Sequence, residues 1–104
     1  MSTDRIDALR RMLERAPGDA RLHFGIALEH EKRGDWAETV AALQRYLELG
    51  DDQGNGWGRL GHALRQLGRS DEAAAAYSRA VEEADHHGHP SMAAEFQDIL
   101  DDWN

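Results

Sequence analysis

A cluster of side chains that can bind metals lies near the C-terminal end of the sequence, in the order Asp85-His86-His87-Gly88-His89. Imidazole and carboxylate groups are ligands for divalent metals such as zinc. His86, His87 and His89 are therefore candidates for weak metal binding. Adjacent histidines point in different directions, and no second cluster is placed to complete the ligand shell. A polar turn between two helices is the alternative interpretation.

Two other fragments resemble functional motifs but lack the context that those motifs need. Residues 56–61 read Gly-x-Gly-x-x-Gly, but a dinucleotide fingerprint follows a strand, and here a helix precedes it. Residues 30–34 begin like the helix of a zinc protease and lack its second histidine. His23 and His30 share one helix face and are interpreted as half-buried packing residues. No nucleophile, catalytic acid–base pair or phosphate loop stands out, so we predict a non-enzymatic protein without cofactors.

Length and charge narrow the class of protein further. The chain has 104 residues, twelve basic and twenty acidic, with a formal net charge of −8. The length fits one small domain, expected to cover residues 1–104. The negative charge argues against a nucleic-acid partner, because such binding depends on neutralising phosphates. The sequence has no cysteine, no apolar run long enough for a membrane span, and no signal-peptide segment at its start. We therefore expect a cytoplasmic protein with no membrane partner.

The spacing of apolar residues is helical along nearly the whole chain. It predicts six helices, arranged as three antiparallel hairpins, and no strand. The expected breaks lie at Pro17-Gly18, Gly34, Gly50–Gly54, Gly68 and Asp85–His89. The expected helix starts are Thr3 or Asp4, Asp19, Asp35 with Glu38 in a capping box, Ser70, and Pro90 in a first turn.

One stretch of sequence recurs thirty-four residues later. Residues 34–38 read Gly-Asp-Trp-Ala-Glu, and residues 68–72 read Gly-Arg-Ser-Asp-Glu, with apolar residues at matching offsets around both. A period of this length is typical of stacked helical hairpins. The most regular pattern is Trp57-x-x-Leu60-Gly61-x-x-Leu64 followed by Ala73-x-x-x-Tyr77-x-x-Ala80. It closely resembles the tetratricopeptide repeat, in which large and small residues alternate so that paired helices nest.

The resemblance implies an all-α fold, a right-handed superhelix of stacked helix pairs. Its segments would be a half repeat at 4–17, a first repeat at 20–53, a second repeat at 54–87 and a capping helix at 90–103. The first repeat is the looser match, with His23 in the place of the tryptophan and Thr39 in the place of an alanine.

The resemblance also implies a concave groove that binds a peptide of another protein, lined by the first helix of each repeat. The groove residues carried over are Arg21, Phe24, Leu28, Lys32, Asn55, His62, Arg65 and Gln66. Phe24 and Leu28 lie on the opposite side of their helix from Leu22 and Ile26, so one apolar side faces something other than the hairpin partner. Residues 54–68 contain two arginines and no acid, which favours a ligand with acidic groups.

Alternatives remain open at this stage. Phe24 could instead pack on the first helix, against Leu9 and Leu13. The last helix could seal the fifth helix with Met92, Phe96 and Trp103, or leave them exposed and mediate self-association as a structural scaffold. A monomer and a weak homodimer are both compatible with the sequence.

Overall fold

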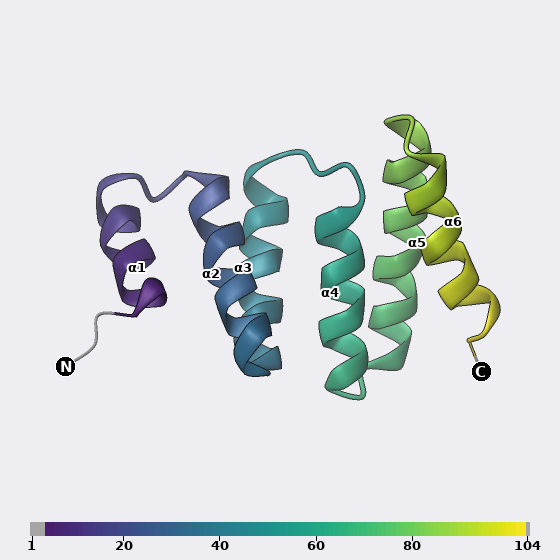
Figure 1. The fold of residues 1–104 in the computed structure, drawn as a ribbon, viewed down its shortest axis with the longest axis horizontal. Helices are drawn as coiled ribbons and strands as arrows, with labels where there is room; N and C mark the ends of the chain where they lie inside the picture. Colours follow the sequence, from purple (N-terminus) through teal and green to yellow (C-terminus); the bar gives the residue numbers. More distant parts are fainter. Residues whose placement is uncertain (1–3, 104) are drawn as a thin grey trace. The chain divides into compact units, whose positions relative to one another are not determined.

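The computed structural model describes residues 4–103, which form six α-helices and no strand (Figure 1). The helices are α1 (Arg5–Arg15), α2 (Ala20–Arg33), α3 (Trp36–Leu49), α4 (Asn55–Gln66), α5 (Ser70–His86) and α6 (Pro90–Asp101). The all-α class and the count of helices are therefore as predicted for this part of the chain. None of these helices combines the length and the apolar character that crossing a bilayer requires.

The helices belong to two compact units, one ending at Gly50 and the other beginning at Asp51. In the first unit, α2 pairs with α3, and α1 packs on α2. In the second unit, α4 pairs with α5, and α6 packs on α5. Consecutive helices thus pack in adjacent pairs, as the repeat predicts. The boundary between the units lies close to the predicted junction of the two repeats, and the single domain over residues 1–104 stays a prediction.

The bends inside the two hairpins share one backbone structure. Gly34 has φ 72°, in the left-handed region that glycine adopts without a steric penalty. Its N–H donates to the carbonyl of Glu31 at 3.1 Å, and the next N–H, of Asp35, donates to the carbonyl of His30 at 3.0 Å. This pair of bonds is the Schellman motif. Gly68 repeats it, with φ 76°, and both predicted helix ends are confirmed.

The two N-terminal helices start as the sequence predicts. The carboxylate of Asp4 accepts from the N–H of Asp7 at 3.0 Å, and that of Asp19 accepts from the N–H of Arg21 at 3.0 Å. Thr3, the other candidate for the first cap, lies outside the described residues.

The predicted caps of α3 and α5 are wrong in detail. Asp35 occupies the N-cap position, but its side chain forms no cap hydrogen bond. The capping box with Glu38 does not form, because the Asp35 N–H is already bonded to the carbonyl of His30. Ser70 is the first residue of α5 instead of its cap, since the bend at Gly68 places Arg69 in the N-cap position.

The start of α4 depends on a residue that the sequence did not single out. Asp52 is buried, and its carboxylate accepts from the backbone N–H groups of Gly54, Gly56 and Trp57 at 2.9 to 3.2 Å. It lies two residues before the N-cap position, which Gly54 occupies with φ 122°. Asp52 thus satisfies donors that a helix start otherwise leaves unpaired.

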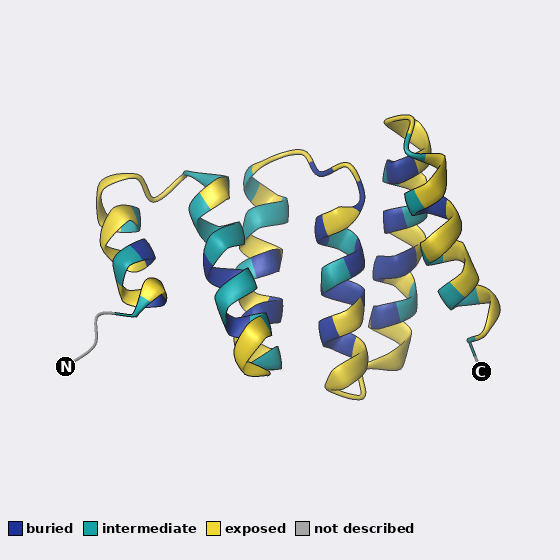
Figure 2. Ribbon diagram, viewed as in Figure 1, coloured by how far each residue is buried: buried dark blue, intermediate teal, exposed yellow. Residues whose placement is uncertain are grey.

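The core of the first unit lies between its three helices (Figure 2). In α1 and α3 the buried apolar side chains lie three residues apart, the spacing that puts them on one face of a helix. The buried apolar residues are Ile6 and Leu9 of α1, Ile26 and Ala27 of α2, and Val40 and Leu43 of α3.

The core of the second unit is organised around Tyr77 of α5, which is 4% exposed. A Cβ atom at Gly61 of α4 would lie 2.9 Å from the Tyr77 ring, so only glycine fits there without a shift. Phe96 of α6 and Trp103, which follows α6, contact the same ring, at centroid distances of 6.0 and 5.9 Å. The last helix therefore seals α5, which confirms the first of the two alternatives for its apolar side chains.

Candidate functional site

The residues predicted to contact a peptide in the first unit follow one line along α2. Arg21 and Lys32 mark its ends, and both side chains are well exposed, at 90% and 71%. Each already has an acidic neighbour: Arg21 pairs with Asp19 at 3.3 Å, and Lys32 pairs with Glu29 at 3.1 Å. Exposed pairs of this kind contribute little to stability. The cations therefore remain available to an acidic ligand at a small energetic cost.

The centre of this line consists of two half-buried apolar residues, Phe24 and Leu28. The Phe24 ring packs on Tyr46 of α3, with centroids 4.9 Å apart and planes tilted by 52°. Phe24 thus contacts the hairpin partner α3, a neighbour that the sequence pattern did not assign to it, and its ring stays half-buried. Leu9 of α1 approaches α2 at Gly25 instead, where a Cβ atom would meet its methyl group at 3.4 Å. Because α2 lies between two helices, it has an apolar contact on each side.

The residues predicted in the second unit lie on α4, and Asn55, His62, Arg65 and Gln66 are all exposed. Asn55 and His62 are seven residues apart, which places them on the same helix face. Arg65 has a second role, because its guanidinium carbon lies 4.5 Å from the centre of the Trp103 ring. Arg65 therefore also holds the residues that follow α6 in place, by a cation–π contact with Trp103.

The two arginines of the acid-free stretch at residues 54–68 differ in exposure, since Arg65 is exposed and Arg59 is not. Arg59 is half-buried, and Arg65 is packed on an aromatic ring. Trp57, expected between the paired helices, is half-buried under Arg79 of α5, whose guanidinium carbon lies 5.2 Å from the ring centre. Among the predicted contact residues, Arg65 is the cation that packs on an aromatic ring, and Arg21 and Lys32 pair with acidic side chains instead.

The histidines near the C-terminal end are held by different partners. The helix α5 continues through His86, so the predicted break is shorter than expected. His87 bonds the carbonyl of Glu83 through Nδ1 at 2.9 Å, and His89 bonds the side chain of Gln53 through Nε2 at 2.6 Å. Among residues 4–103, the group of side chains close enough to share a metal lies elsewhere.

Antiparallel helix pairs that recur at a fixed sequence period define a helical-repeat protein. The sequence matches the family model for the tetratricopeptide repeat at residues 6–55, 24–88 and 59–96. The chain therefore belongs to the tetratricopeptide repeat family. Repeats of this family are generally modules for protein–protein interaction and are typically non-catalytic. A search of curated proteins found no match.

Proposed function

We propose that this chain is a non-enzymatic adaptor that binds a peptide segment of another protein along the exposed face of α2. The observation that carries the proposal is the composition of that face. Two half-buried apolar side chains, Phe24 and Leu28, lie between two exposed cations, Arg21 and Lys32. Apolar anchors with charged groups around them are typical of surfaces that bind peptides.

The chemistry of this face favours a ligand with an apolar residue and nearby carboxylates. Leu28 and Phe24 would supply most of the binding energy, because apolar area is removed from water there. Lys32 and Arg21 would exchange their present partners, Glu29 and Asp19, for carboxylates of the peptide and so set its direction.

We propose that the exposed face of α4 is a second surface that contacts a peptide. Asn55 and Gln66 carry amide groups that can both donate to and accept from a peptide backbone. His62 adds an imidazole to the same face. The charge of Arg65 remains exposed next to Trp103 and would attract an acidic residue.

A charge reversal tests the proposal, with a matched control in the same unit. Lys32 is an exposed cation in an i, i+3 pair on the proposed face, and Arg45 is an exposed cation in an i, i+3 pair with Glu48 on α3. For a partner captured from native cell extract, Lys32→Glu should weaken binding about tenfold, or about 1.4 kcal/mol. Arg45→Glu should leave the affinity unchanged. Equal affinity of both variants and the wild type would show that the α2 face is not the binding surface.

Self-association through α6 is the alternative function, and the exposure of the apolar side chains in this part of the chain does not support it. Met92, Phe96 and Trp103 are half-buried against their own unit. Among residues 4–103, the exposed large hydrophobic residues are Met12 and Leu67, and neither belongs to α6.

A further inference from the structure

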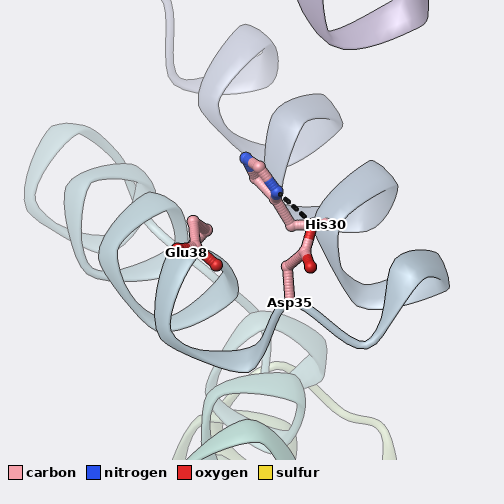
Figure 3. A group of neighbouring side chains, drawn as sticks. All are labelled: His30, Asp35 and Glu38. Atoms are coloured by element: carbon pink, nitrogen blue, oxygen red, sulfur yellow. Dashed lines mark hydrogen bonds and ion pairs between the residues drawn. The ribbon is translucent and has the colours of Figure 1, made fainter.

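One imidazole and two carboxylates come together at the bend between α2 and α3 (Figure 3). They belong to His30, Asp35 and Glu38, and one ligand atom of each lies within 4.8 Å of the other two. His30 Nδ1 and Asp35 Oδ2 are 3.3 Å apart. The His30 side chain is 9% exposed, so its ring is fixed in the core, whereas Glu38 is exposed.

The backbone explains why these three side chains meet. The Schellman motif at Gly34 bonds the Asp35 N–H to the His30 carbonyl and returns the chain to the last turn of α2. Asp35 therefore lies beside His30 although five residues separate them. Glu38 follows Asp35 by three residues at the start of α3, the spacing at which side chains share a helix face.

The fold itself does not require this polar group, as the second repeat demonstrates. The equivalent positions, thirty-four residues later, hold Leu64, Arg69 and Glu72. The bend at Gly68 has the same two backbone hydrogen bonds. There Leu64 is a buried core residue, and Arg69 pairs with Glu72 at 2.7 and 2.8 Å.

In the first repeat, the two carboxylates do not carry out the usual tasks of a helix start. Asp35 lies at the N-cap of α3 but forms no side-chain cap bond, and its carboxylate bonds to His30 instead. Glu38 forms no hydrogen bond or ion pair with any residue between 4 and 103. Two carboxylates without a capping role thus lie against a buried imidazole.

We propose that His30, Asp35 and Glu38 form a binding site for a divalent transition metal, with zinc as the best fit. Zinc bonds of about 2.0 to 2.2 Å in tetrahedral geometry separate the ligand atoms by roughly 3.4 Å. The nitrogen and oxygen of His30 and Asp35 are already at nearly that separation. Glu38 is exposed and can close the remaining distance by a change of rotamer, and water would take the fourth position.

Charge and proton balance are consistent with this site. Two carboxylates with a neutral imidazole carry two negative charges, which match the charge of the ion. A carboxylate only accepts hydrogen bonds, so the present bond to Asp35 needs a proton on Nδ1 of His30. The metal takes the place of the Nδ1 proton, which leaves to solvent, and Nε2 takes up a proton from solvent, so the bound ring is neutral with its single proton on Nε2. The ion would then join the end of α2 to the start of α3 and stabilise the hairpin by mass action.

Metal titration of the whole chain, freed of any purification tag, tests the proposal. Zinc chloride is followed by calorimetry, and cobalt chloride by its visible absorption. We expect saturation at one equivalent per chain. His30→Leu, which copies the residue of the second repeat, and Glu38→Gln, at an exposed position, should each weaken binding at least about tenfold. Circular dichroism of Glu38→Gln checks that the helices are intact, so a loss there does not reflect unfolding.

A chain with glutamine at His86, His87 and His89 is the matched control, because it removes three histidines away from the proposed site. It should bind zinc as the wild type does. The proposal is overturned if the wild type shows no saturable binding, or if either single variant binds within twofold of the wild type. It is also overturned if the triple variant loses binding, since the metal would then belong to the turn before α6.

Discussion

The guanidinium group of Arg65 lies over the ring of Trp103, 4.5 Å from its centre. Trp103 in turn meets Tyr77 edge-on, with centroids 5.9 Å apart. A residue predicted to contact a ligand therefore also belongs to a stack that ties the segment after α6 to α4 and α5. A substitution at Arg65 changes both a surface charge and this stack, so it does not probe binding alone.

Trp103→Ala should lower the free energy of unfolding by about 1 to 2 kcal/mol, because it removes an aromatic pair and a cation–π contact. Urea unfolding followed by circular dichroism measures the change. The exposed neighbour Asp102 provides the control, and Asp102→Ala should stay within about 0.5 kcal/mol of the wild type. Equal stability of both variants would mean that the segment after α6 does not hold the unit together.

Gly61→Ala should destabilise the protein by about 1 to 3 kcal/mol, even though alanine favours helices by about 1 kcal/mol over glycine. The reason is the buried ring of Tyr77, which the added Cβ atom would approach to 2.9 Å. The first repeat has Ala27 and Leu43 at the two equivalent positions. Thermal unfolding should therefore show recovery in the double variant Gly61→Ala/Tyr77→Leu. A single variant more stable than the wild type would contradict the packing described for this pair.

The ion pair between Arg69 and Glu72 should respond to pH in a defined direction. The side-chain hydrogen bonds from Arg69 hold the pKa of Glu72 below its ordinary value of 4.5. The folded pKa is lower than the unfolded one, so the pair stabilises the protein above about pH 4.5. That contribution is lost as the pH falls through the lowered pKa.

Carboxyl carbon shifts in an NMR titration measure this effect directly. Arg69→Gln should raise the pKa of Glu72 towards 4.5. Asp19, whose pKa is lowered by its hydrogen bond from Arg21, provides the control and should titrate as before. A Glu72 titration that does not change in the variant would show that the pair is not formed in solution.

The helices and their ends were predictable where one residue decides the local backbone. Gly34 and Gly68 end helices because glycine alone adopts the left-handed conformation freely. Asp52 was not predictable as a cap, since it acts across a glycine with positive φ instead of from the N-cap position. The choice of cap depended on the path of the chain between Gly50 and α4, which residue types alone do not define.

The contacts of the candidate site were harder to predict than its helices. Helical periodicity places Phe24 on a face of α2 but does not say which neighbour its ring contacts, and that neighbour is Tyr46 of α3. Asp35 and Glu38 matched a capping box in sequence, yet the bend satisfies the amide that the box would bond. The signal available in the sequence was His30 at the position where the other repeat has Leu64.

The bend that recurs at Gly34 and Gly68 has the same backbone conformation in both copies, although different side chains surround it. Its hydrogen bonds join main-chain atoms only, so the flanking positions can differ freely between the two copies. Because Glu72 already corresponds to Glu38, Leu64→His with Arg69→Asp would place the same three residue types around the second bend. Leu64 is buried in the core of its unit, so this exchange would set an imidazole into that core, as His30 is set into the core of the first unit.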